Sequence, residues 1–246
     1  MKVVGRLEGK YALITGGSRG IGKSIAAHFR AEGARLIVVD RLEELGRAFV
    51  AELGPPATFR LMDVTDEQAW RLLASDLTDD PVDVLVNNAG GLQVPKQLHE
   101  MEPIEWRREI ELNLTSVFFG MRFMIPIMLR GHGGSVINIA SMSGVAGQCD
   151  AAGYQAAKGG VRLLTKNGAV TYASRGIRVN AINPGVIATE VVRAQPNQRV
   201  QLFIDATPMG RMGLPQDVSQ AAVFLASDES AFVTGAEINV DGGYLA

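Results

Sequence analysis

The stretch "YALITGGSRGIGKSIAAHF" (residues 11–29) joins a short apolar run to a glycine-rich turn and then to a helical pattern that ends near Gly33. Residues 11–15 are strand-like. Glycines let the backbone turn tightly and approach a pyrophosphate, and the first N–H groups of the following helix can bind an anion. This order of strand, turn and helix predicts a nucleotide-binding unit, although the spacing G-x-x-x-G-x-G differs from the common pattern G-x-G-x-x-G.

The alternation of strand-like and helical segments continues through the rest of the chain. Several strand-like runs are continuously apolar, which is typical of strands buried on both faces of a parallel sheet. The six further strand-like runs cover residues 35–40, 57–63, 82–88, 134–140, 177–183 and 236–243. We therefore expect one α/β domain over residues 1–246, a Rossmann fold with a doubly wound, seven-stranded parallel sheet and helices on both faces.

Composition narrows the class of protein. The chain has 246 residues, of which 47% are hydrophobic, and a single cysteine, Cys149, which excludes an internal disulfide and fits a reducing compartment. A net charge of −2 argues against nucleic-acid binding. The N-terminus lacks the apolar core expected of a leader peptide. The apolar run 117–129 is interrupted by Arg122 and Pro126 and is too short to span a bilayer. We expect a cytoplasmic protein with no nucleic-acid or membrane partner.

The end of the second strand-like run bears on cofactor choice. Ligands of such sheets bind at the carboxyl ends of the strands, and Asp40 ends this run. Its carboxylate can accept hydrogen bonds from ribose hydroxyls and would repel a 2′-phosphate, which favours NAD over NADP. Arg19, in the glycine turn, and Arg41 could each meet a phosphate, so NADP remains the alternative. Asp40 could also be an ordinary cap at the end of the strand.

Other candidate cofactor residues lie in the turns that follow the strands. Asp63 and Val64 could flank an adenine ring, and Thr189 could bond a nicotinamide carboxamide. The sequence "NNAG" (87–90) would leave room for the cofactor or would simply form a tight turn. The remaining candidates are small or apolar residues of these turns: Gly16, Ser18, Gly20, Ile21, Gly22, Asn88, Ala89, Gly90, Pro184, Gly185, Val186 and Ile187.

The segment "YQAAK" (154–158) carries the chemistry that we expect. Tyr154 and Lys158 are four residues apart and project from one face of a helix. A free phenol has a pKa of about 10, and a nearby ammonium favours phenolate, so the pair could exchange a proton with an alcohol oxygen. Ser141, thirteen residues earlier at a strand end, could hydrogen-bond the substrate oxygen, with Ser143 as a rival. Met142 is a further candidate substrate contact.

Two other segments complete the candidate site. Asn113 interrupts an apolar helical run, where it could bend the helix and hold a water that connects to Lys158, or could be a satisfied buried amide. Residues 190–206 are polar with helical patches, which indicates a mobile flap over the substrate. We expect residues near Gln93 and Val94, the segment 142–152 and this flap to line a roomy apolar pocket, to which Val145, Ala146, Ala151 and Ala152 would contribute small side chains.

Over essentially its whole length the sequence resembles the short-chain dehydrogenase/reductase family. The resemblance rests on "TGGSRGIG", "DV" (63–64), "NNAG", Asn113, Ser141, "YQAAK" and "PGVIAT" in this order. It implies a catalytic tetrad in which Tyr154 is the acid/base and Ser141 holds the substrate oxygen. Lys158 would bind the nicotinamide ribose, with Tyr154 beside it, and lower the tyrosine pKa, while Asn113 would anchor a relay water. It also implies direct hydride exchange without a metal, and a homotetramer.

Three functions are consistent with these residues. The first is NAD-dependent oxidation of secondary alcohols, reversible with ketones, on uncharged, bulky or cyclic substrates. The second, favoured by Arg19 and Arg41, is NADPH-dependent reduction of 3-oxoacyl-carrier-protein thioesters. The third is a catalytically idle nucleotide-binding module, which the presence of both Tyr154 and Lys158 disfavours.

Overall fold

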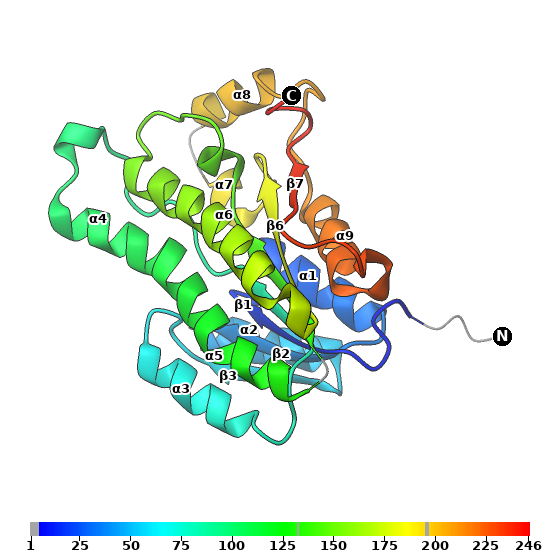
Figure 1. The fold of residues 1–246 in the computed structure, drawn as a ribbon. Coiled ribbons are helices and arrows are strands. Elements are labelled where there is room, and N and C mark those ends of the chain that lie inside the picture. Colours follow the sequence, from blue (N-terminus) through cyan, green and yellow to red (C-terminus); the bar gives the residue numbers. More distant parts are fainter. Residues whose placement is uncertain (1–4, 132, 195–196) are drawn as a thin grey trace.

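The computed structural model describes residues 5–131, 133–194 and 197–246. Its strands form one parallel sheet in the order β3-β2-β1-β4-β5-β6-β7. Figure 1 shows helices packed around this sheet. The strands are β1 (Tyr11–Thr15), β2 (Arg35–Asp40), β3 (Ala57–Leu61), β4 (Val84–Asn87), β5 (Gly134–Ile139), β6 (Ile177–Pro184) and β7 (Glu237–Val240). The predicted doubly wound sheet is confirmed. β3, β4 and β7 are shorter than predicted, since the ends of the predicted runs lie in the adjoining turns.

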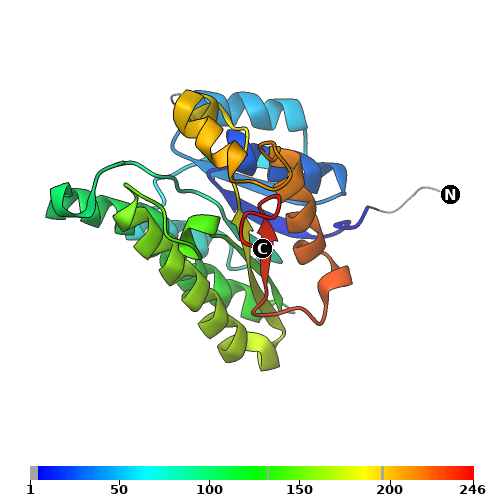
Figure 2. The same cartoon turned by 90° about the horizontal axis from the view of Figure 1, so that it is seen from above.

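Helices cover both faces of the sheet. They are α1 (Gly20–Ala31), α2 (Glu43–Leu53), α3 (Glu67–Asp76), α4 (Pro103–Ile110), α5 (Ser116–Arg130), α6 (Ala152–Tyr172), α7 (Glu190–Arg193), α8 (Asn197–Asp205) and α9 (Pro215–Ala226). Figure 2 shows the blue α1 and orange α9 on one side of the strands and the green α4, α5 and α6 on the other. The order of the strands reverses between β1 and β4, so neighbouring connections leave this point toward opposite faces.

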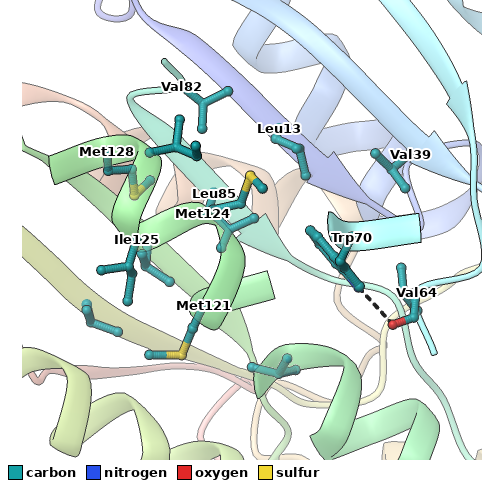
Figure 3. Close-up of a cluster of buried hydrophobic side chains, with 14 of the residues drawn as sticks. Leu13, Val39, Val64, Trp70, Val82, Leu85, Met121, Met124, Ile125 and Met128 are labelled. Atoms are coloured by element: carbon teal, nitrogen blue, oxygen red, sulfur yellow. Dashed lines mark hydrogen bonds between the residues drawn. The ribbon is translucent and has the colours of Figure 1, made fainter. Parts of the chain in front are cut away.

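Each face has its own hydrophobic core. On the first, Ile25 and Phe29 of α1 pack with Val218 and Ala222 of α9 against the sheet. On the second, α3, α5 and α6 cover the strands, and Trp70 of α3 is fully buried among them (Figure 3). Continuous apolar strands can be buried in this way on both sides, as the sequence predicted.

The second face also contains a long interrupted helix. α4, a π-helical turn (Glu111–Thr115) and α5 run on from one another through Pro103–Arg130. Among the described residues this is the one helix long and apolar enough to cross a membrane by length and composition, because α4 and the π-helical turn extend the short apolar run 117–129. Half of its apolar window is buried inside the fold, and α5 contributes Met121, Met124 and Met128 to the core. These contacts are those of a core helix.

Buried amides tie the strands to the helices behind the site. Asn87 Nδ2 of β4 donates to Asn138 Oδ1 of β5 at 2.8 Å, and Asn138 Nδ2 donates to Thr165 Oγ1 of α6 at 2.9 Å. Gly120 of α5 is required here, because a Cβ at this position would lie 2.2 Å from Asn87 Oδ1. Buried polar groups are stable only when they are hydrogen-bonded, so this chain of contacts fixes α5 and α6 relative to the strand ends.

Replacing Trp70 should destabilise the fold. Its Nε1 donates to the Val64 carbonyl oxygen at 2.9 Å inside the core (Figure 3). Trp70→Phe would leave this carbonyl unpaired and create a cavity, which should lower the free energy of unfolding by about 2 kcal/mol. Denaturant unfolding followed by circular dichroism measures the change. Trp106→Phe is the control, because Trp106 is 39% exposed. Equal effects of the two substitutions would contradict this account of Trp70.

Candidate active site

A cavity of about 360 Å³ opens at the carboxyl edge of the sheet. It gathers nearly all of the predicted cofactor and substrate residues: Gly16, Arg19, Gly20, Ile21, Asp40, Arg41, Asp63, Val64, Asn88, Ala89, Gly90, Ser141, Met142, Tyr154, Lys158, Pro184, Gly185, Val186, Ile187 and Thr189. Ser18, Gly22 and Asn113 lie behind this wall. A single cavity therefore runs from the nucleotide end to the candidate chemical end.

The glycine turn is shaped by close backbone approach. Gly16 and Gly20 have φ values of +62° and +56°, which favour glycine. A Cβ on Gly22 would lie 2.2 Å from the Gly16 carbonyl oxygen. Asn88 Nδ2 donates to the carbonyl oxygens of Thr15 (2.9 Å) and Gly16 (3.0 Å), so "NNAG" holds the turn in place as well as leaving room beside it.

Asp40 is held by the backbone at the nucleotide end. Its side chain is 8% exposed, and its two carboxylate oxygens accept from Ser18 N (3.0 Å) and Leu42 N (3.1 Å). Arg19 and Arg41 line the same part of the cavity and are exposed. The two backbone hydrogen bonds thus fix the orientation of the Asp40 carboxylate, while the guanidinium groups of Arg19 and Arg41 lie on long, solvent-exposed side chains.

A dinucleotide fits the residues at this end. Ser18 Oγ is buried and has no hydrogen-bond partner within the described part of the chain. It lies in the turn that precedes α1, where helix N–H groups favour a phosphate. The absence of side chains at Gly16 and Gly20 leaves the backbone of the turn accessible. Asp40 and Ser18 would hold a nucleotide from its ribose and phosphate sides.

Tyr154, Lys158 and Ser141 meet at the other end of the cavity. Lys158 is 3% exposed, and its Nζ donates to the Ile139 carbonyl oxygen at 2.8 Å and lies 5.8 Å from the centre of the Tyr154 ring. Ser141 Oγ accepts from Ser143 N at 3.1 Å. Ser143 Oγ itself donates to Gln148 Oε1, so the rival hydroxyl is turned toward the loop.

Burial dominates the protonation of the tyrosine and lysine. It raises the pKa of Tyr154, against a hydrogen bond with Ser141 that lowers it, and the charge of Glu109 raises it further. Burial lowers the pKa of Lys158 from 10.5 to about 8, although Glu109 acts in the opposite direction. Removing the phenol from water thus outweighs the hydrogen bond with Ser141 in setting the pKa of Tyr154, and the lowering by Lys158 that the family resemblance implied stays a prediction.

Asn113 occupies the π-helical turn and is fully buried. Its Nδ2 donates to the carbonyl oxygens of Gly91 and Glu109, both at 3.1 Å, and to Glu109 Oε2 at 2.9 Å. Its Oδ1 accepts from Gly91 N at 2.8 Å. Regular α-helical hydrogen bonding gives way to a π-helical turn at Asn113, whose side chain binds the loop after β4, and the predicted bend of the helix stays a prediction. A role for Asn113 in holding a relay water stays a prediction.

Glu109 is the main functional candidate that the sequence reasoning missed. It is fully buried four residues before Asn113, and the i, i+4 spacing was the available signal. Gln148 and Glu190 also line the cavity without having been predicted individually.

The substrate wall differs in part from the prediction. Gln93, Met142 and the predicted flap contribute, the flap through Val191, Val192, Val200 and Phe203. Val94, Val145, Ala146, Ala151 and Ala152 do not line the cavity, so the prediction that they do was wrong. Val145 is 44% exposed, and the carbonyl oxygens of Ser143 and Ala146 on either side of it accept hydrogen bonds from Gln155 Nε2. Residues 195–196 of the flap lie outside the described residues, and its mobility stays a prediction.

Known proteins share this sequence and fold. A family model described as Enoyl-(Acyl carrier protein) reductase matches residues 16–245. A cyclopentanol dehydrogenase from Comamonas testosteroni is 42% identical, and the alignment covers 99% of this chain and 100% of that protein. An NADP-dependent (R)-specific alcohol dehydrogenase from Lentilactobacillus kefiri is 40% identical, and the alignment covers 98% of each chain. A crystal structure described as a short-chain dehydrogenase/reductase from Burkholderia xenovorans has a TM-score of 0.92 and 38% identity, covering 98% of each chain. The chain is a Rossmann-fold oxidoreductase and belongs to the short-chain dehydrogenase/reductase family.

The buried lysine should make stability depend on pH. Between its folded pKa of about 8 and its unfolded value of 10.5, Lys158 binds more protons in the unfolded chain, so the free energy of unfolding rises with pH across this window. Relative to Lys158→Met, the wild type should gain ~3 kcal/mol over the window. Parallel denaturant titrations of both proteins measure this difference. The same pH dependence in both would show that the pKa of Lys158 is not lowered in the folded protein.

Proposed function

We propose that this protein is an NAD-dependent dehydrogenase that interconverts secondary alcohols and ketones, with Tyr154 as the acid/base. The proposal rests on the convergence of Tyr154, Ser141 and Lys158 at one end of a cavity whose other end fits a dinucleotide. The nicotinamide, when bound, supplies the acceptor for the hydride of the alcohol carbon. In the oxidation direction, Tyr154 phenolate removes the hydroxyl proton while Ser141 donates a hydrogen bond to the substrate oxygen.

The protonation states of the chain suit this exchange. The raised pKa of Tyr154 keeps the phenol protonated near neutrality, and this form donates a proton to a ketone oxygen. Alcohol oxidation needs the phenolate, so its rate rises with pH. Lys158 is held by the Ile139 carbonyl oxygen within a turn of the tyrosine, where a charged ammonium opposes protonation of the phenolate.

The lining of the cavity supports an uncharged substrate. Around Tyr154 the described wall is made of Met142, Gln148 and the apolar flap residues, and it contains no ionisable side chain apart from the tetrad itself. Glu190 of the flap points elsewhere, since its Oε2 lies 3.9 Å from the position of a Cβ on Gly20. Such a surface favours apolar bulk and gives no cation for an anionic substrate. The similarity to a cyclopentanol dehydrogenase supports cyclic secondary alcohols.

NADPH use is the second candidate. Arg19 and Arg41 line the cavity, and the Lentilactobacillus relative is NADP-dependent. The fixed carboxylate of Asp40 weighs against it, because a 2′-phosphate brought next to Asp40 would bring like charges together in a site partly shielded from water.

Turnover should depend on the Tyr154 hydroxyl. A panel of cyclic and acyclic secondary alcohols, ketones, steroids and acyl thioesters, read by the absorbance of reduced nicotinamide, should show activity on uncharged alcohols and ketones. Tyr154→Phe should lower kcat by roughly 10²–10⁴-fold, because the proton then has no acceptor. Tyr172→Phe, at the far end of the same helix, is the control. Full turnover by Tyr154→Phe would contradict the mechanism, and activity on thioesters with NADPH alone would favour a 3-oxoacyl-carrier-protein reductase.

Cofactor preference should depend on the charge of Asp40. Asp40→Asn keeps the size of the side chain and removes its charge, so the ratio of kcat/KM for NADH to that for NADPH should fall on the order of tenfold, or about 1.4 kcal/mol. Initial rates with both cofactors give this ratio. Asp63→Asn removes another carboxylate of the cavity wall and should change the ratio less. A wild-type preference for NADPH would refute the choice of NAD.

A further inference from the structure

Glu109, the last acidic residue of α4, has an unusual environment for a carboxylate. It is fully buried, and no cation of the described residues lies within ion-pair distance of it. Oε1 accepts from the backbone N–H groups of Gln93 (2.7 Å) and Val94 (2.8 Å), and Oε2 accepts from Asn113 Nδ2 (2.9 Å). Burying a charge is costly unless hydrogen bonds compensate it, and here three N–H donors converge on the two oxygens.

These contacts join two segments of the site that are separate in sequence. Gln93 and Val94 belong to the loop that leaves β4, and Gln93 lines the cavity. Asn113 lies in the π-helical turn, and its side-chain amide binds both the N–H and the carbonyl oxygen of Gly91 in the same loop. The Glu109 carboxylate therefore binds this loop at Gln93 and Val94, two and three residues beyond Gly91, which Asn113 binds.

The stem of Glu109 rests on the helix that carries the tyrosine. α4 and α6 pack side by side (Figure 1), and Gly153, directly before Tyr154, faces Glu109. A Cβ on Gly153 would lie 2.9 Å from the Cβ and 3.1 Å from the Cγ of Glu109. The missing side chain at Gly153 thus lets Glu109 pass between α6 and the loop and contact both.

The same carboxylate influences the ionisable groups of the site. The loop Gly91–Val94 has no ionisable side chain, and the groups on α6 that respond to Glu109 are Tyr154 and Lys158. Its negative charge raises the pKa of both, because it disfavours phenolate and favours ammonium.

We propose that Glu109 is a positioning residue, whose carboxylate fixes the loop Gly91–Val94 to Asn113 and to the start of α6, and so sets the substrate wall at Gln93 against Tyr154. The role presupposes the oxidoreductase function proposed above. Glu109 touches neither substrate nor cofactor in this arrangement, and it acts through the loop, Asn113 and the field at Tyr154.

Glu109→Gln tests the role with a side chain of the same size. In one orientation the glutamine NH₂ group would face Asn113 Nδ2, which is also a donor. In the other it would face the N–H groups of Gln93 and Val94, and those two hydrogen bonds would be lost. We expect kcat/KM to fall by on the order of 10- to 100-fold, the usual cost of a misplaced site. In alcohol oxidation, the acidic limb of the pH profile should move to lower pH, because the charge that raises the Tyr154 pKa is gone. Glu111→Gln, exposed two residues further on, makes the same change in net charge and should leave both quantities unchanged.

Amide hydrogen exchange tests the structural part without substrate, cofactor or turnover. In the wild type the Gln93 and Val94 amides should exchange slowly for loop positions, and in Glu109→Gln they should exchange faster, while Glu111→Gln matches the wild type. This readout separates the two proposals. Failure of the alcohol and ketone panel with slow exchange at Gln93 and Val94 would overturn the proposed function and leave the fastening of the loop standing.

Gly153→Ala is a second variant that keeps the carboxylate. Alanine favours a helix over glycine by about 1 kcal/mol, so loss of helix stability would not explain an effect. The added methyl should displace Glu109, speed exchange at Gln93 and Val94 and lower kcat/KM, with the pH limb at its wild-type position. Unchanged exchange in both variants, or a pH limb that stays fixed in Glu109→Gln, would overturn the proposal.

Discussion

The hydrogen bonds between Thr15 and Asn88 hold together the ends of β1 and β4, the two neighbouring strands at which the sheet reverses its order. Thr15 Oγ1 accepts from the backbone N–H groups of Asn88 (3.0 Å) and Ala89 (3.1 Å), and the Asn88 amide binds the glycine turn in return. Because the connections leave these strands toward opposite faces, the chain itself keeps a crevice open between them. The cavity of the candidate site lies at this crevice.

The buried ionisable groups of the site are stabilised by the same kind of partner. Asp40, Glu109 and Lys158 are all buried, and each is compensated mainly by peptide or amide groups and not by an opposite charge. Peptide partners belong to the sheet and the helices, so they do not move as flexible charged side chains do. The field in the cavity is therefore fixed by the fold, and salt in the solvent screens it little.

The sequence predicted the parts of the site that follow from local pattern. Glycines after a strand, an acidic residue at the end of β2 and a tyrosine one helical turn before a lysine need no knowledge of distant contacts. Glu109 escaped because a charged residue on a helix is ordinarily solvent-facing, and its burial depends on a loop that returns from β4. Val145 was assigned to the pocket wrongly because its exposure depends on how its loop packs in the folded chain, which the local sequence does not express. The protonation of Tyr154 depends on how deeply the assembled helices bury it, which spacing alone does not express.

The short helices α7 and α8 give the cavity its apolar substrate wall, yet they carry no member of the tetrad. The residues of the proposed tetrad lie on α6, on the turn after β5 and in the π-helical turn, which pack against the cores of the fold. The residues proposed to contact the substrate and those proposed to carry out the reaction therefore lie largely on different elements of the fold. Under the proposed function, residues of α7 and α8 could change, and the range of substrates with them, while the groups held by the cores keep their arrangement.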